Sequence, residues 1–138
     1  MEIEVSVAKE AARRADPARV ARLHQLCDEL ETLEGDIVRS STNDLDFHRE
    51  IALATENEFW VLLFDILGGA LTETRVATFS MDPRRFSIVV AAHRRIAEGI
   101  GSGDPEQAAE AMRDHLLEVK QTWDKHPEVV HVCGEDCR

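Results

Sequence analysis

The chain has 138 residues and a formal net charge of -11 at pH 7. This length fits one domain, and the negative charge repels phosphate backbones, so these residues alone are poorly suited to bind DNA or RNA. No stretch approaches the roughly 20 apolar residues that cross a membrane, and the first residues lack the basic-then-apolar order of a secretory signal. We therefore expect a cytoplasmic protein with no membrane partner.

Helix signals recur along the chain, whereas strand signals are nearly absent. Asp-Pro pairs begin at Asp16, Asp82 and Asp104. Each pair predicts a helix start, because the aspartate can accept hydrogen bonds from the first free amides and the proline has no amide to leave unpaired. Together with the helical spacing of apolar residues, these pairs predict six helices. They are expected over approximately 2–15, 17–34, 42–55, 57–78, 83–100 and 105–125.

The predicted connections are short, which favours antiparallel neighbours. We therefore expect an all-α antiparallel bundle of about six helices over residues 1–126, followed by an irregular tail over 127–138. The fourth helix is apolar nearly all round from Phe59 to Leu67, which predicts that it is the most buried. Gly68-Gly69 is expected to weaken this helix or to allow a kink.

Three predicted helices each carry a histidine on their apolar face, and one of them adds a carboxylate. Asp44 and His48 are four residues apart on the third helix, which places both side chains on one face. His93 and His115 lie among apolar residues of the fifth and sixth helices. Neutral imidazoles with one carboxylate suit zinc, and nickel, cobalt or manganese with less preference.

Each of these residues also has an ordinary structural explanation. A single inward histidine is usually a hydrogen-bonded core residue, and Asp44, near the predicted start of a helix, could be only a cap. A buried carboxylate and buried imidazoles need partners, however, and one shared cation would satisfy them together. The pattern alone leaves a metal site and a set of satisfied core residues both open.

Two longer motifs resemble a known family. The segment DLDFHREIALATEN, from Asp44 to Asn57, is similar to the D-x-x-F-H…N stretch of the FCD domain. This is the ligand-binding domain of FadR-type GntR transcriptional regulators. The segment from Ala92 to Leu116 resembles the H-x-x-I…G-D…A…M…H-L stretch of the same family, with a matching interval between its two histidines. The resemblance covers essentially the whole chain.

The resemblance implies a helical bundle that binds a divalent metal, and no catalytic residues. By motif, the metal ligands fall on Asp44, His48, His93 and His115. It also implies a small organic acid as effector beside the metal, and a homodimer whose attached winged helix-turn-helix domains bind DNA. We expect that DNA-binding domain to be absent from this chain, so that DNA would be a partner only through a domain outside it.

Two further residues are candidate contacts for the effector. The family often places a basic residue at the position of Arg75, where a guanidinium could bind a carboxylate through two hydrogen bonds; the alternative is a solvated charge. Asn57 is either a second contact or a helix cap. Arg85, like its neighbours on the fifth helix, is expected to be a surface charge. Cys133 and Cys137 in the tail give only a weak zinc signal.

The leading hypothesis is therefore an effector-sensing domain without enzymatic activity. A metal-dependent enzyme is the alternative, but enzymes on metal-binding bundles use several inward carboxylates with Glu-x-x-His pairs. No glutamate stands three residues before His48, His93 or His115, and no general base is evident beside the proposed metal. A stand-alone effector-binding or dimerisation module is a third possibility; as a purely structural module it would leave the three inward histidines unexplained.

Overall fold

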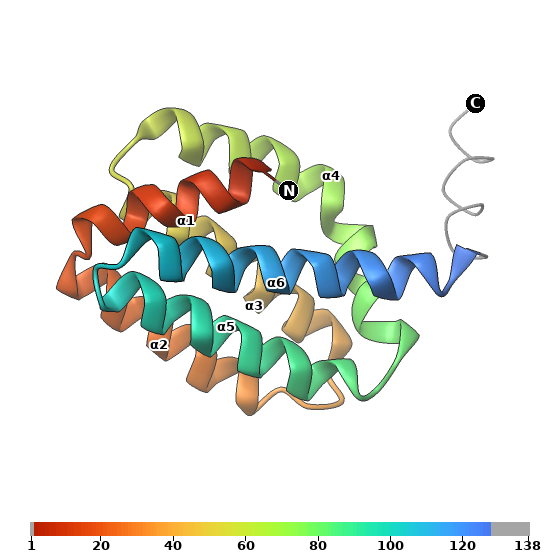
Figure 1. The fold of residues 1–138 in the computed structure, drawn as a ribbon. Helices are drawn as coiled ribbons and strands as arrows, with labels where there is room; N and C mark the ends of the chain where they lie inside the picture. Colours follow the sequence, from red (N-terminus) through yellow and green to blue (C-terminus); the bar gives the residue numbers. More distant parts are fainter. Residues whose placement is uncertain (1, 128–138) are drawn as a thin grey trace.

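The computed structural model describes residues 2–127, which form six helices and no strand (Figure 1). The helices are α1 (Glu2–Arg14), α2 (Pro17–Glu31), α3 (Ile37–Ala54), α4 (Glu58–Met81), α5 (Arg85–Gly101) and α6 (Pro105–Asp124). The predicted all-α fold is thus confirmed. None of the described helices is long and apolar enough to cross a membrane. The predicted tail lies, from residue 128 onward and with both of its cysteines, outside the described residues.

Side-chain caps fix several helix starts where the sequence predicts them. Asp16 accepts hydrogen bonds from the backbone amides of the second and third residues of its own helix, and Asp104 does the same for α6. Asp82 accepts a hydrogen bond from the amide of Arg84, but α5 begins only at Arg85. Asn57 caps α4 by accepting a hydrogen bond from the amide of Phe59.

Helix α3 begins five residues earlier than the sequence analysis predicts. Asp36 caps it, and the hydroxyl groups of Ser41 and Thr42 donate hydrogen bonds to backbone carbonyls one turn back. Such bonds allow a polar run to remain helical, although Ser and Thr usually favour caps and turns. Asp44 therefore lies well inside α3 and does not cap it. Helix α2 differs too, since it ends at Glu31 and not near residue 34.

The packing of the helices leaves α4 at the edge of the bundle (Figure 1). Helix α6 packs against α1 and α5, and α3 packs against α2 and α4. Gly68 lets α3 and α4 approach closely, since a Cβ there would lie 2.8 Å from Leu45 Cδ1. Helix α4 continues through both glycines without interruption, so the predicted weakening does not end it.

The prediction that α4 is the most buried helix is wrong for the single chain. Phe59, Leu62 and Ile66 are 62%, 59% and 63% exposed. They recur at intervals of three and four residues, so they form one face of α4. We call this the α4 apolar face. Only the opposite side of the helix packs on the bundle, and Phe64 on that side is buried. Within residues 2–127, no second layer of helices covers this edge.

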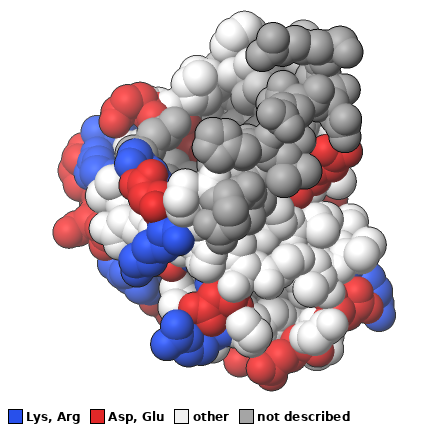
Figure 2. Space-filling model, turned by 90° about the vertical axis from the view of Figure 1, so that its right-hand side faces the viewer, with Lys and Arg blue, Asp and Glu red and all other residues white. Residues whose placement is uncertain are grey.

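Figure 2 shows the end of the bundle where α4, α5 and α6 come together. Charged side chains of both signs lie mainly around the rim of this face, and uncharged side chains fill much of its middle. Among the described side chains that this view shows, Lys and Arg do not form a continuous basic surface.

Candidate metal centre

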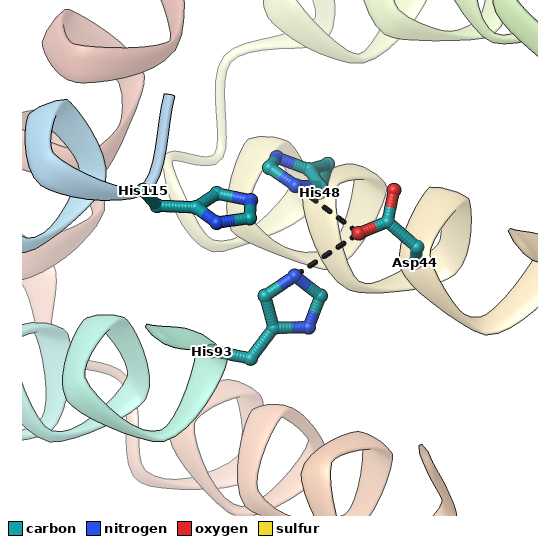
Figure 3. A group of neighbouring side chains, drawn as sticks. All are labelled: Asp44, His48, His93 and His115. Atoms are coloured by element: carbon teal, nitrogen blue, oxygen red, sulfur yellow. Dashed lines mark ion pairs between the residues drawn. The ribbon is translucent and has the colours of Figure 1, made fainter. Parts of the chain in front are cut away.

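The structure brings together the four residues that the sequence analysis proposes as metal ligands. Asp44 and His48 come from α3, His93 from α5 and His115 from α6 (Figure 3). One ligand atom from each residue lies within 4.8 Å of all the others. All four side chains are buried, and His93 is completely inaccessible to solvent.

Close packing of neighbouring residues holds the histidines in place. Gly99 lets α5 approach α6, because a Cβ there would lie 2.9 Å from the backbone nitrogen of Ala108. This approach brings the ring centroids of His93 and His115 to 5.1 Å. Phe47 stacks on the His93 ring at a centroid distance of 4.0 Å, with the planes nearly parallel. Backbone contact and aromatic stacking together determine where the rings point.

The polar atoms of the cluster face one another without forming a closed hydrogen-bond network. Oδ1 of Asp44 lies 3.1 Å from Nε2 of His93 and 3.8 Å from Nε2 of His48 (Figure 3). The His93–Asp44 contact is close, but its geometry is not that of a hydrogen bond, and both ring nitrogens of His93 are buried without a hydrogen-bond partner. Nδ1 of His115 is likewise buried without a hydrogen-bond partner. Unpaired buried nitrogens are costly, so these histidines do not fit the ordinary explanation of satisfied core residues.

Burial also favours the protonation state that a metal requires. It lowers the pKa of His93 well below the ordinary histidine value, and the neighbouring His48 and the positive charge of Arg75 act in the same direction. Burial lowers the pKa of His115 in the same way, with further contributions from the neighbouring histidines and from Arg85 and Arg75. Both rings are therefore neutral at pH 7, and a neutral imidazole is the form that donates a lone pair to a metal. The donor set thus fits a divalent ion.

A glutamate on α1 supports the cluster from outside. Oε1 of Glu4 lies 3.0 Å from Nδ1 of His48, the ring nitrogen opposite the one that faces Asp44. Burial alone would raise the pKa of Glu4, but the interactions with His48 and Arg75 outweigh it and lower the pKa overall. A carboxylate behind a histidine is typical of metal sites. Sequence reasoning missed this residue, although Glu4 is in helical register with the buried Ala8.

Two arginines reach the same region from α4 and α5. Arg75 forms an ion pair with Oδ2 of Asp44, and its side chain is only 16% exposed. Arg85 is 1% exposed, so the prediction of a surface charge is wrong. Its guanidinium makes two hydrogen bonds, of 2.6 and 2.9 Å, to the carboxylate of Glu118. Arg85 precedes His93 by eight residues, which is two turns along the same face of α5, so helical register could have indicated its burial.

A small cavity of roughly 150 Å³ adjoins the cluster. Asp44, His48 and His115 contribute to its wall together with both arginines, and Glu4, two threonines and several apolar side chains complete the lining. Its volume is below that of sites for drug-sized ligands, which suits a small molecule. Asn57 is not among the lining residues; the structure places it at the start of α4, as a cap.

Residues 1–118 match the FCD domain family, so the chain belongs to that family. This confirms the resemblance that the two histidine-containing motifs indicate. Two similar proteins carry the name "Putative L-lactate dehydrogenase operon regulatory protein", one from Escherichia coli (strain K12) and one from Shigella flexneri. Each is 35% identical over 132 residues, which cover 91% of this chain and 49% of the relative.

A third similar protein is the HTH-type transcriptional regulator LutR of Bacillus subtilis (strain 168). It is 28% identical over 122 residues, which cover 86% of this chain and 56% of LutR. The chain thus spans about half the length of the curated relatives it matches. These relatives carry the names of regulatory proteins, in agreement with the prediction that the chain has no enzymatic activity.

Proposed function

We propose that the chain is the effector-sensing domain of a GntR-type transcriptional regulator. In this proposal it binds one divalent metal and a small carboxylate beside it. The observation that carries the proposal is the buried cluster of Asp44, His48, His93 and His115, whose unpaired nitrogens adjoin a cavity with two arginines. The regulatory names of the relatives support the same function.

Zinc is the metal that best suits this donor set. Three neutral imidazoles and one carboxylate are ordinary zinc ligands, although nickel, cobalt and manganese accept the same groups. When bound, the metal would supply a positive charge beside the cavity wall, where it can attract or coordinate an anion. Asp44, His48 and His115 belong both to the metal cluster and to the cavity lining. The metal and the effector would therefore lie next to each other.

A small organic acid is the proposed effector. The cavity is small and partly apolar, and Arg75 offers a guanidinium that can bind a carboxylate. The name of the E. coli relative refers to an L-lactate dehydrogenase operon, which makes L-lactate the first acid to test. An effector contact by Asn57 stays a prediction, as does the cytoplasmic location.

The wider regulator would contain parts that lie outside these residues. DNA would be contacted by an attached helix-turn-helix domain, and effector binding here would alter its geometry. We further propose that the domain forms a homodimer through the α4 apolar face, because exposed apolar surfaces of this kind mark protein interfaces.

The first test is the metal content of the purified protein. We expect about one divalent metal per chain and a rise in melting temperature when L-lactate is added to the metal-loaded protein, as linkage requires. His93→Ala should lose the metal and the stabilisation by lactate together. His24→Ala is the matched control, since His24 lies outside the cluster.

Two results would contradict the proposal. Metal-free protein that shows no affinity for zinc, nickel, cobalt or manganese would exclude the metal centre. A stabilisation by lactate that survives in His93→Ala would place the effector somewhere other than beside this cluster.

A further inference from the structure

The two oxygens of Asp44 have different partners. Oδ1 faces the ring nitrogens of His48 and His93, at 3.8 and 3.1 Å, whereas Oδ2 is paired with the guanidinium of Arg75. Asp44 is 6% exposed, so its charge is screened little by water. The cation that compensates this carboxylate in the metal-free chain is therefore Arg75.

A divalent metal would compete with Arg75 for the same carboxylate. The charged groups in and beside the cavity wall comprise three carboxylates, Glu4, Asp44 and Glu118, and two guanidiniums, Arg75 and Arg85. Asp44 and Arg85 are buried, whereas the side chains of the other three are partly exposed. With neutral histidines, this set has one negative charge in excess. A bound divalent ion would change the excess to one positive charge. The metal-free set therefore disfavours an anion, and the loaded set requires one.

Arg75 is placed to bind that anion. Its side chain lines the cavity, and its Nε is buried without a hydrogen-bond partner. Once Oδ1 of Asp44 binds the metal, the metal would compensate most of the charge of this carboxylate, and the largely buried guanidinium on Oδ2 would be left with a weaker counter-ion, which is unfavourable. Arg85 cannot take this role as readily, because Glu118 already engages it through two hydrogen bonds.

Building on the proposed function, we propose that Asp44 and Arg75 exchange ion-pair partners. Asp44 passes from Arg75 to the metal, and Arg75 passes from Asp44 to the carboxylate of the effector. Metal and carboxylate therefore bind with positive coupling, each raising the affinity of the other by the same factor. Arg75 has two opposite effects in this scheme. Without an effector carboxylate, Arg75 weakens metal binding because it competes for Asp44. When the carboxylate is present, Arg75 is required for the carboxylate to strengthen metal binding.

The experiment measures the zinc affinity of the full chain by competition with a chromophoric chelator, with and without L-lactate. In the wild type, lactate should raise the zinc affinity by at least about fivefold, the lower end of typical coupling. Arg75→Gln should bind zinc more tightly than the wild type without lactate, and lactate should no longer change its affinity. Arg75→Lys keeps the charge but not the planar donor pair, so its zinc affinity should stay close to that of the wild type while the lactate effect weakens.

Arg49→Gln is the matched control. Arg49 on α3 pairs with Asp65 on α4, so it links the same two helices as the Asp44–Arg75 pair, but both members of the pair are substantially exposed. This variant should behave as the wild type with zinc and with lactate.

The exchange is overturned if Arg75→Gln binds zinc no more tightly than the wild type, or if lactate still strengthens its zinc binding. Should that variant fail to fold, the lactate affinity of the wild type is measured with and without zinc. Equal affinities overturn the exchange. The proposed function still stands in that case, provided that the wild type binds zinc. A wild-type chain that binds no metal overturns both.

Discussion

Among the single residues, the centre of the bundle contains buried ring nitrogens that lack hydrogen-bond partners and a buried carboxylate that needs a cation. Both ring nitrogens of His93 and one of His115 are buried without hydrogen-bond partners, while Asp44 shares its two oxygens between histidines and Arg75. A metal would satisfy the nitrogens and the carboxylate at once. On the far side of the His48 ring, Oε1 of Glu4 approaches Nδ1 to 3.0 Å.

The role of Glu4 leads to a prediction about metal affinity. Glu4→Gln keeps the size of the side chain but removes the negative charge that lies 3.0 Å from Nδ1 of His48. Loss of such a supporting carboxylate typically weakens metal binding by about 10- to 100-fold. Isothermal titration of the metal-free variant with zinc measures the change.

Glu10→Gln provides the control for this prediction. Glu10 lies on the same helix and accepts a hydrogen bond from the indole of Trp60, away from the cluster. Equal zinc affinities for the two variants would show that Glu4 has no part in metal binding.

At the scale of elements, each helix contributes through the face that its neighbours cover. Helices α3, α5 and α6 are covered on the sides that carry the ligands, so their histidines are buried. Helix α4 packs mainly on α3 and leaves its other side open. One side of this apolar helix thus completes the bundle, and in the proposed homodimer the α4 apolar face would contact a second copy.

A single charge on that face should prevent dimerisation. Leu62 is 59% exposed at its centre, and Leu62→Glu would bury an unpaired carboxylate in the dimer. We expect the wild type to be dimeric and the variant monomeric by light scattering after gel filtration, with unchanged helix content by circular dichroism.

Leu117→Glu is the control, because Leu117 is an exposed leucine on α6, with 40% of its surface accessible. It should leave the dimer intact. A Leu62→Glu protein that remains dimeric would place the interface on another face.

At the scale of the whole molecule, buried neutral histidines make the free energy of unfolding depend on pH. The pKa values of His93 and His115 are lowered in the folded chain, whereas in the unfolded chain they return to about 6.5. Below that pH the unfolded chain takes up protons that the folded chain does not. The stability that these groups contribute is thus complete above about pH 7 and is lost as the pH falls below the unfolded pKa.

Urea unfolding of the chelator-treated protein between pH 7.5 and pH 5.5 tests this dependence. Each of the two histidines should lower the free energy of unfolding by up to about 1.4 kcal/mol per pH unit in the acidic part of the range. His93→Gln should reduce the slope, and His24→Gln should not. A stability that is constant over this range would contradict the assignment of neutral buried histidines.

The sequence by itself determined the features that depend on local chemistry. Aspartate caps at Asp16 and Asp104 and the helical spacing of apolar residues were enough to predict six helices, and the same spacing turned three histidines inward. Local signals were insufficient at α3, which begins at Ile37. Its first turns are rich in Ser and Thr, which usually indicate caps and turns, but here their hydroxyl groups bond to the preceding turn of the helix. Caps and periodicity depend only on neighbours in the chain. They therefore predict helices well where the local signal is clear, and they fail where the local signal is ambiguous.

Only the tertiary structure decided which charged and apolar side chains are covered. Arg85 is buried because a glutamate 33 residues away reaches its guanidinium, and Glu4 belongs to the site because α1 passes beside His48. Phe59, Leu62 and Ile66 of α4 stay exposed because none of the described helices lies over them. Burial is a relation between distant segments, and a charge can be buried only where another segment supplies its partner.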